Sequence, residues 1–291
     1  MKKKILFIIN PISGGKSKKK MPSIIDQHLD KEKYDVRISY TERVEHAYLL
    51  SKAAVKENYD IVVAVGGDGT VNEVAKGLLN SNIIMGIVPF GSGNGLARTL
   101  KIPLNPVKAV KVFNNYNSIK IDSASLNNHF FFNMAGTGFD ATISHQFANL
   151  KSRGFSGYVK TTFKELSSYK PETYTIQYDG NTIVEKAFIV SVANSSQYGN
   201  EAHIAPHADV CDGLLDLVVV KPFPWYLFPS LAVKMFTKTA HTSNYVKIYK
   251  AKNIVIERAL ESPIHIDGEP HMESAKLNIQ IIPLSMNIIV P

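Results

Sequence analysis

The sequence predicts a two-domain protein in which an α/β domain with a parallel sheet precedes a mainly antiparallel β-sandwich domain. In the first third of the 291 residues, continuous apolar runs alternate with helical patterns. That alternation is typical of βαβ units and of a parallel sheet covered on both faces. After about Ile121 the helical patterns become rare, and short strands with turn signals follow one another. A hydrophobic content of 45% can supply both cores.

The elements of the first domain follow from these patterns in chain order. The expected strands are Ile5–Ile9, Tyr34–Tyr40, Ile61–Val65 and Met85–Val88. The expected helices are Ser17–Leu29, Val44–Glu57, Val71–Leu79, Leu96–Leu100 and Val107–Phe113. Within the second of these helices, Ala47, Leu50 and Ala54 recur at helical spacing on one face.

The second domain is expected to contain mostly strands. These are His129–Asn133, Thr173–Tyr178, Thr182–Val192, Leu215–Val220, Tyr245–Tyr249, Asn253–Arg258, Ile264–Ile266, Leu277–Ile282 and Met286–Val290. Helical patterns interrupt them near Asp140–Lys151 and Ser156–Ser168. We place the first domain at residues 1–121 and the second at 122–283, with a C-terminal tail, 284–291, that could return to the first domain.

Charge and cysteine content limit the possible partners and compartment. The net charge of +8 favours anionic partners such as phosphorylated metabolites, nucleic acid or an acidic membrane surface. Cys211 is the single cysteine, so no intrachain disulfide can form, which fits a reducing compartment. The apolar run Ile5–Ile9 is too short for a secretion signal, and no run approaches the ~20 residues that span a bilayer. We expect a cytoplasmic protein that could contact the inner face of a membrane.

Three glycine-rich loops follow strands of the predicted parallel sheet. They are Asn10–Lys16, Gly66–Thr70 and Pro89–Arg98. Carboxyl ends of parallel strands meet at one edge, where free N–H groups and helix N-termini attract phosphate. Asp68 would repel a bare phosphate, but it could reach a Mg²⁺ ion carried by that phosphate, directly or through water.

These loops carry a family resemblance. The motifs NPISGGK, VGGDGTVNEV and PFGSGNGLAR together closely resemble the catalytic domain of diacylglycerol kinases, a superfamily that includes bacterial lipid kinases, sphingosine kinases and ceramide kinases. The resemblance spans nearly the whole chain. It implies a first domain of the NAD-kinase and phosphofructokinase type that binds ATP, and a second domain that receives the lipid.

The resemblance also implies site residues. The implied ATP-binding residues are Asn10, Pro11, Ser13, Gly14, Lys16, Thr41, Gly66, Gly67, Asp68, Gly69, Thr70, Asn72, Ser92 and Asn94. Lys16 is equally well interpreted as a solvated member of a lysine run. The segment Asn133–Ala141 resembles the family's GxGFDA motif, whose implied place is the lining of the substrate cleft.

Two further motifs of the second domain resemble those of the family. DGLLDL implies a structural Mg²⁺ site with Asp212 as side-chain ligand and Asp209 and Leu214 as flanking ligands through carbonyl oxygens. The Asp267-Gly268-Glu269 turn matches the DGE motif. Glu269 is the expected proton acceptor, and Asp267 is its partner or its link to the catalytic metal.

The lipid acceptor is left open at this point. An aromatic stretch, Pro222–Phe236, could shelter acyl chains and meet an anionic membrane, or it could be a short helix packed in the core. Gly95 departs from the commonest bacterial pattern towards sphingosine and ceramide kinases. However, Thr142 stands where sphingosine kinases carry the acid that holds the sphingoid amine. A neutral lipid alcohol, diacylglycerol, is therefore the first choice.

Other function classes remain as alternatives. A sphingoid-base or ceramide kinase uses the same motifs, and an NAD kinase belongs to the same superfamily. A non-catalytic lipid- or nucleotide-binding regulator is disfavoured by the presence of Asp68 and Glu269. No nucleic-acid-binding signature accompanies the positive charge. We expect a monomer or a homodimer.

Overall fold

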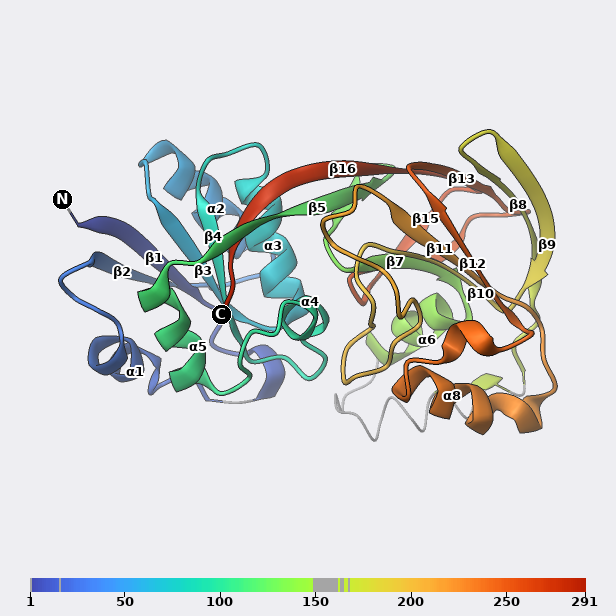
Figure 1. Cartoon of the computed structure of the whole chain (residues 1–291), viewed down its shortest axis with the longest axis horizontal. Helices are drawn as coiled ribbons and strands as arrows, with labels where there is room; N and C mark the ends of the chain where they lie inside the picture. Colours follow the sequence, from blue (N-terminus) through green and yellow to red (C-terminus); the bar gives the residue numbers. More distant parts are fainter. Residues whose placement is uncertain (1, 16, 149–161, 163–164, 167) are drawn as a thin grey trace. The chain divides into compact units, whose positions relative to one another are not determined.

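The computed structural model describes residues 2–15, 17–148, 162, 165–166 and 168–291. The chain divides into two compact units, one comprising Met1–Asp122 with Leu284–Pro291 and the other Ser123–Pro283. Figure 1 follows the chain through both units. The fold class is the one expected from the sequence, an α/β unit with a parallel sheet and a β-sandwich unit.

The first unit is built on a parallel sheet in the order β2-β1-β3-β4, to which the end of β16 adds a further parallel strand. The strands are β1 (Lys3–Ile9), β2 (Tyr34–Tyr40), β3 (Ile61–Gly66), β4 (Ile84–Pro89) and β16 (Lys276–Ile289). Every residue of β3 is buried, as expected for a central strand with helices on both faces. The C-terminal strand pairs with β4 through Asn287 opposite Ile84.

Helices cover this sheet on both faces (Figure 1). They are α1 (Met21–His28), α2 (His46–Lys56), α3 (Asp68–Leu78), α4 (Gly95–Thr99) and α5 (Pro106–Val112), with 3-10 turns η1 (Ser13–Gly15) and η2 (Phe113–Asn115). Asn105 starts α5 because its side chain accepts a hydrogen bond from Lys108 N and Pro106 follows it in the first turn. These helices confirm the helical patterns of the sequence, with α1 starting later than expected.

The second unit is a sandwich of two sheets. The first sheet is antiparallel throughout, in the order β12-β11-β10-β7-β14-β15. Its strands are β7 (Met134–Gly138), β10 (Ile189–Ala193), β11 (Leu215–Val220), β12 (Val246–Ala251), β14 (Ser262–Ile266) and β15 (Glu269–Glu273). The other sheet places β16 next to β13 (Asn253–Glu257), then β8 (Glu172–Tyr178) and β9 (Asn181–Ala187). The end of β5 (Ser118–Leu126) and β6 (His129–Phe131) complete it.

Strand β11 shows how the antiparallel sheet is buried on both faces. Leu215, Leu217 and Val219 point into the core between the two sheets. Val218 and Val220 alternate with them and belong to a second apolar cluster on the outer face of the sheet. The elements that contribute to this second cluster include α6 (Phe139–Ala148) and α8 (Phe228–Phe236), the latter preceded by η3 (Trp225–Leu227) and followed by η4 (Ala240–Thr242).

Several expectations about strands were wrong, and the strands β5 and β15 were not expected. Thr182–Val192 is two strands, β9 and β10, which lie in different sheets and separate at Phe188. Leu277–Ile282 and Met286–Val290 form the single strand β16, which continues through Pro283 and a left-handed Leu284. Met134–Gly138, for which no strand was expected, is the buried strand β7. The helix expected at Ser156–Ser168 lies largely outside the described residues, as does the end of the one expected at Asp140–Lys151.

Candidate active site

The three glycine-rich loops of the first unit come together, as the sequence predicted from the parallel sheet. Backbone hydrogen bonds join their origins, with Asn10 N donating to Val65 O at 3.0 Å and Phe90 N to Gly66 O at 2.7 Å. Gly14 has φ +62° and approaches so closely that a Cβ there would lie 1.7 Å from Phe90 O. Glycine is required here because the contact with Phe90 O leaves no room for a Cβ, and the left-handed backbone disfavours other residues as well.

Asp68 ties two of these loops together. Its Oδ2 accepts a hydrogen bond from Asn94 N and its Oδ1 accepts one from Gly95 N, both at 2.9 Å. These N–H groups begin helix α4, where a carboxylate is favoured by the orphan donors and the helix dipole. In this structure Asp68 therefore braces the loop after β4, a role that the sequence did not indicate.

Asn94 shapes the same loop from within. It adopts a left-handed conformation with φ 53°, which asparagine tolerates better than most residues. Its side chain accepts a hydrogen bond from Gly91 N and donates one to Gly91 O, both at 2.8 Å. A Cβ on Gly91 would lie 2.8 Å from Gly67 Cα, so the two loops touch through their backbones. The result is a preformed glycine surface whose shape depends on Asp68 and Asn94.

The other expected nucleotide-binding residues lie on or beside these loops, at different depths. Pro11, Gly14 and Ser92 are exposed, whereas Asn10, Ser13, Gly67, Asp68, Gly69 and Asn72 are half-buried and Thr41, Gly66, Thr70 and Asn94 are buried. Asn10 Nδ2 donates to Thr70 Oγ1 at 3.0 Å, which links the first loop to helix α3. Lys16 lies outside the described residues.

Lys18 is a residue that the sequence did not single out. It is 3% exposed, its ammonium group donates to Ser13 O, and it lies 5.1 Å from the centre of the Phe90 ring. It therefore holds the first loop against the third. The sequence could not predict which lysine of the run Lys16–Lys20 is buried, because several neighbouring residues are also lysines.

In the second unit, the Asp267-Gly268 turn joins β14 to β15. Both residues have positive φ, 49° and 89°, which suits a tight hairpin of the primed type. The Asp267 carboxylate accepts hydrogen bonds from three consecutive backbone N–H groups, those of Phe132, Asn133 and Met134, at 2.9 to 3.0 Å. Glu269, at the start of β15, is exposed. The turn is thus anchored by its aspartate and presents its glutamate at the surface of the unit.

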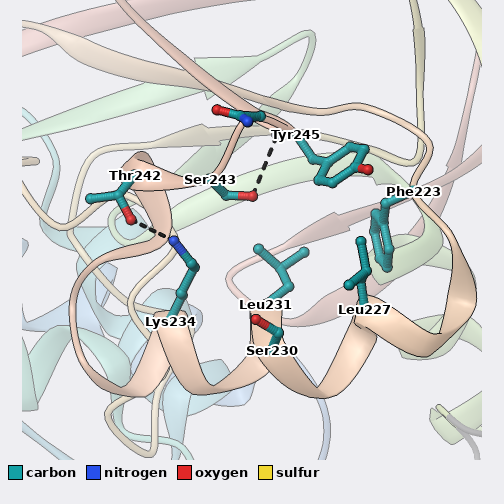
Figure 2. Close-up of a pocket in the computed structure, with 9 residues that line it drawn as sticks. Phe223, Leu227, Ser230, Leu231, Lys234, Thr242, Ser243 and Tyr245 are labelled. Carbon is teal, nitrogen blue, oxygen red and sulfur yellow. Dashed lines mark hydrogen bonds between the residues drawn. The ribbon is translucent and has the colours of Figure 1, made fainter.

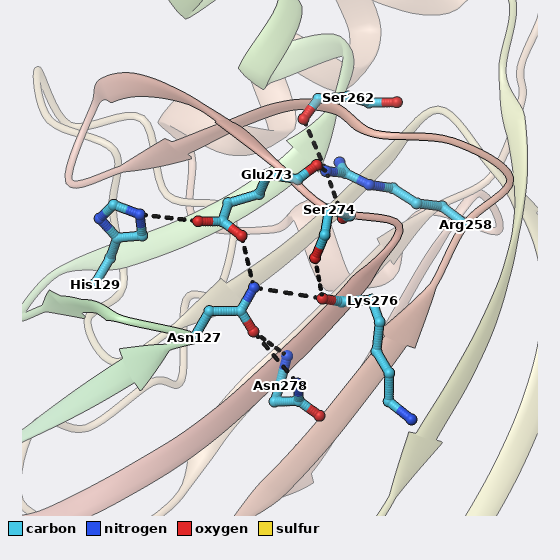
Figure 3. A network of polar contacts seen from close by, with 8 residues as sticks. All are labelled: Asn127, His129, Arg258, Ser262, Glu273, Ser274, Lys276 and Asn278. Atoms are coloured by element: carbon cyan, nitrogen blue, oxygen red, sulfur yellow. Dashed lines mark hydrogen bonds and ion pairs between the residues drawn. The ribbon is translucent and has the colours of Figure 1, made fainter.

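Arg258 holds the rest of this hairpin in place (Figure 3). The side chain is buried, and burial lowers the pKa of its guanidinium. Its donors reach Thr137 Oγ1 and the backbone carbonyls of Ser262, Pro263, Glu273 and Ser274, at 2.6 to 3.2 Å. Because these partners belong to both strands of the hairpin and to β7, Arg258 fixes the position of the strands that carry Glu269.

Glu273 connects the end of the hairpin to β6 (Figure 3). Its carboxylate accepts from Asn127 Nδ2 at 2.7 Å and lies 3.0 Å from His129 Nε2. Burial opposes ionisation, but the bonds from Asn127 and His129 outweigh it, so the pKa of Glu273 lies below its usual value.

A buried polar cluster stands beside the same strands and was missed from the sequence. Asp140 Oδ2 accepts from Tyr198 Oη at 2.8 Å and lies 3.1 Å from His265 Nε2. A Cβ on Gly136 would lie 2.9 Å from His265 Nε2. Glycine is therefore needed at this position to accommodate the histidine, and not to form a turn. Its partners are far apart in sequence, and no local pattern could have identified them.

The DGLLDL segment places its acids near a lysine. Asp212 Oδ2 lies 2.6 Å and Asp216 Oδ2 lies 3.4 Å from Lys250 Nζ. Burial raises the pKa of Asp216, whose Oδ2 is buried and accepts no hydrogen bond from the described residues. Asp209 is exposed, and its Oδ1 accepts from Cys211 N. In the described part of the chain, no three side chains of His, Cys, Asp or Glu group together as they would to hold a metal ion.

Comparison with known proteins assigns both units. Residues 4–126 match the diacylglycerol kinase catalytic domain, and residues 133–290 match the YegS C-terminal NAD kinase beta sandwich-like domain. A diacylglycerol kinase of Staphylococcus aureus strain bovine RF122 / ET3-1 is 30% identical over 276 residues, which is 92% of this chain and 87% of the relative. The chain belongs to the diacylglycerol kinase family.

Solved structures agree on the fold. A crystal structure of a diacylglycerol kinase from Bacillus anthracis str. Sterne has a TM-score of 0.78 and 23% identity, and covers 99% of this chain and 97% of its own. A second structure from the same strain, with the same coverage, has a TM-score of 0.79 and 25% identity. Membership of the diacylglycerol kinase family supports a kinase activity with ATP as phosphoryl donor and a lipid as substrate.

Proposed function

We propose that the protein is an ATP-dependent kinase that transfers the γ-phosphoryl group of ATP to the hydroxyl of diacylglycerol, giving phosphatidic acid. The observation that carries this proposal is the anchored DGE turn, which presents the exposed Glu269 carboxylate, in a chain of the diacylglycerol kinase family. In this proposal the first unit binds the nucleotide and the second unit receives the lipid.

The glycine loops support the assignment of ATP to the first unit. Backbone N–H groups from residues 10–14 and 66–72 would receive the phosphates, with Thr41 and Ser92 as further contacts. Asp68 and Lys18 fix the conformation of these loops through hydrogen bonds to their backbone. Preformed loops are an advantage in phosphoryl transfer, since catalysis depends mainly on positioning and electrostatics.

The phosphoryl step needs a group that accepts the proton of the lipid alcohol. The hydroxyl oxygen forms a bond to the γ-phosphorus, the bond from that phosphorus to the bridging oxygen breaks, and its electron pair leaves with ADP. We assign the proton to the Glu269 carboxylate. Asp267 is less suited to this task because three backbone N–H groups already occupy its oxygens. Its proposed task is to position Glu269.

Mg²⁺ fits two places in this chain by donor chemistry. The Asp68 carboxylate, whose two oxygens accept hydrogen bonds from Asn94 N and Gly95 N, suits an indirect contact with the ion through water. In the DGLLDL segment, the carbonyl oxygens of Asp209 and Leu214 and the Asp212 carboxylate would hold a structural ion. Asp216 and Asp212 share the Lys250 ammonium group, so a second acid lies close to the Asp212 carboxylate. When bound, a Mg²⁺ ion at the nucleotide neutralises charge that develops on the phosphate oxygens.

Thermal unfolding tests the structural ion without any need for catalysis. We expect Mg²⁺ to raise the melting temperature of the wild-type chain in the absence of nucleotide, because an ion that binds only the folded state stabilises it. The shift should disappear in Asp212→Asn and persist in Asp26→Asn, which alters an exposed acid of the first unit. An equal shift in all three proteins would contradict the assignment.

A neutral acceptor is favoured by the surroundings of α6. Thr142 Oγ1 donates to Gly138 O at 3.0 Å, so no carboxylate occupies this position to hold an amine. The nearest acid along the chain, Asp140, is 7% exposed and is engaged by Tyr198 and His265. A sphingoid amine would therefore find no exposed acid here, whereas the alcohol of diacylglycerol needs none.

Phosphorylation of a lipid panel tests the function directly. Purified protein is incubated with labelled ATP and Mg²⁺ and with mixed micelles of diacylglycerol, sphingosine or ceramide, with NAD in a separate reaction. We expect label on diacylglycerol, with the product identified as phosphatidic acid by mass. Label on NAD alone, on a sphingolipid alone, or on no acceptor would overturn the proposal.

A further inference from the structure

The segment Trp225–Phe236 has two apolar faces. On the inner face, Phe228, Leu231 and Met235 pack against the apolar cluster that covers the outer side of the antiparallel sheet. The outer face carries large side chains that are exposed to solvent, namely Trp225 at 74%, Tyr226 at 64%, Val233 at 59% and Phe236 at 49%. We call this outer face the aromatic surface.

The composition of α8 does not suit a helix that faces water. Ser230 and Lys234 are the only polar side chains in its nine residues. A helix at the surface of a soluble protein normally turns a polar stripe to solvent, and one that is apolar all round normally lies in a core or in lipid. Tryptophan and tyrosine are enriched where protein meets the headgroup region of a bilayer, because their rings are apolar and their tips are polar.

The charge around the aromatic surface selects an anionic partner. From residue 217 to residue 256 the sequence contains six lysines and neither aspartate nor glutamate. Lys221 and Lys247 pair with Glu185, and Lys250 pairs with Asp212. Among the described residues, no acidic side chain forms an ion pair with Lys234 or Lys238, which lie on α8 and directly after it. Each lysine near an anionic membrane adds about 1 kcal/mol of attraction.

A cavity of about 230 Å³ lies against the inner side of this segment (Figure 2). Phe223, Leu227, Leu231 and Tyr245 give it an apolar wall. The other end holds Lys234, whose Nζ donates to Thr242 Oγ1 at 2.6 Å. Apolar groups at one end and a cation with hydroxyl groups at the other match the two parts of an amphiphile.

We propose that the aromatic surface docks on a bilayer of anionic phospholipid, with Trp225 and Tyr226 at headgroup depth and Val233 and Phe236 in the acyl region. The exposed Lys238 meets the headgroup phosphates. The proposal rests on the proposed function, since a lipid kinase must reach a substrate that resides in a membrane. It adds the surface by which the chain does so.

A second copy of the chain fits this surface less well. A symmetric dimer across the aromatic surface would bring Lys238 of both copies together, and among the described residues no acidic side chain pairs with it. Like charges at such short range oppose association, whereas an anionic bilayer neutralises them. Both the exposed apolar side chains and the positive charge of this surface therefore favour a bilayer over a second copy of the chain.

Trp225 is the single tryptophan of the chain, so intrinsic fluorescence reports on this surface alone. With vesicles of phosphatidylglycerol and phosphatidylcholine, we expect the emission to shift to shorter wavelength and lipids with brominated acyl chains to quench it. Vesicles of phosphatidylcholine alone should produce a much smaller change. Unchanged emission with both kinds of vesicle would overturn the proposal. A shift that depends on protein concentration without vesicles, with a dimer in light scattering, would also overturn it.

Variants that keep Trp225 distinguish the apolar contribution to vesicle binding from the contribution of charge. The double variant Val233→Ser/Phe236→Ser should weaken partitioning to anionic vesicles about 10-fold or more, since two large apolar groups no longer enter the lipid. Lys238→Gln should weaken it about fivefold and reduce its salt dependence. Leu260→Ser is the matched control, because Leu260 is 73% exposed but lies outside the surface. Equal partitioning of all these proteins would contradict the proposal.

The vesicle measurements need neither ATP nor turnover. A wild-type chain that phosphorylated diacylglycerol in detergent micelles but did not bind anionic vesicles would overturn the docking surface and leave the kinase activity standing. Phosphorylation of NAD alone, with vesicle binding intact, would overturn the proposed function instead.

Discussion

The GGDGT turn of the first unit and the DGE turn of the second differ in what they leave exposed. In both turns an aspartate accepts backbone N–H groups from a distant segment, Asp68 from the start of α4 and Asp267 from residues 132–134. After Asp68 come residues that are half-buried or buried, whereas after Asp267 comes the exposed Glu269. The comparison teaches that a motif aspartate can brace the backbone while a neighbouring acid stays exposed.

The largest expected effect separates the brace from the reacting group. Glu269→Gln should lower kcat by about 100-fold or more, the usual contribution of a general base, with an unchanged melting temperature. Glu261→Gln removes the same charge from an exposed position beside the same hairpin and should leave kcat unchanged. Steady-state phosphorylation and thermal unfolding of both variants check this. Equal activities of the two variants would remove Glu269 from the mechanism.

Asparagine in place of either aspartate tests the braces themselves. Asp267→Asn should lower the free energy of unfolding by about 2–4 kcal/mol, because buried N–H groups lose a charged acceptor. Asp68→Asn should lower it less, since two N–H groups rather than three depend on the carboxylate. Urea unfolding of both variants gives the comparison. A larger loss for Asp68→Asn would show that the number of donors does not set the strength of the brace.

A pair of neighbouring glycines isolates close approach from backbone strain. Gly14 and Gly15 both have φ +62°, but a Cβ on Gly15 has no heavy atom within 4 Å. Gly15→Ala should therefore cost only the ~1–2 kcal/mol of a left-handed residue. Gly14→Ala should cost more and raise the KM for ATP, because Phe90 must move. Calorimetry and ATP titration measure both. Identical behaviour of the two variants would show that the loop is not close-packed.

The smallest expected effect is a dependence on pH in the second unit. The pKa of Glu273 is lowered in the folded chain, so its contribution to stability is present above the pKa of an unfolded glutamate and is lost as the pH falls through the lowered value. The difference in unfolding free energy between the wild type and Glu273→Gln should therefore shrink from pH 7 to pH 3. Glu257→Gln, at an acid that is 44% exposed, should show a weaker trend. Urea unfolding followed by circular dichroism reports it.

The sequence predicted the architecture of the first unit well because its signals are local. A continuous apolar run such as Ile61–Val65 can only be a strand buried on both faces or a helix core, and the glycine turn that follows decides for the strand. The convergence of the three loops then follows from the geometry of a parallel sheet. The part that could not be predicted is which side chains brace them, since Asp68 finds its partners only once α4 is in place.

Prediction was weaker in the second unit because its signals compete. Pro283 and Ser285 interrupt the pattern of β16 as a turn would, yet the strand continues through them. Gly136 and Gly138 look like a turn, yet β7 is a buried strand in which Gly136 accommodates His265. The aromatic stretch could not be assigned to core or surface, because its composition suits both and only packing shows that one face is covered and the other exposed. The roles of Glu269 and of the metal ligands remain predictions.

Strand β16 has a consequence for how the chain folds during synthesis. Its residues Asn287 and Ile288 pair with Ile84 and Met85 of β4, across an interval in sequence that contains the whole second unit. Contacts so distant in sequence are slow to form, because the intervening loop must close first. The first unit therefore emerges from the ribosome with the edge of β4 unpaired, and it can complete its sheet only after the sandwich has been made. A ribosome-bound chain should acquire its second unit before its first unit reaches full resistance to protease.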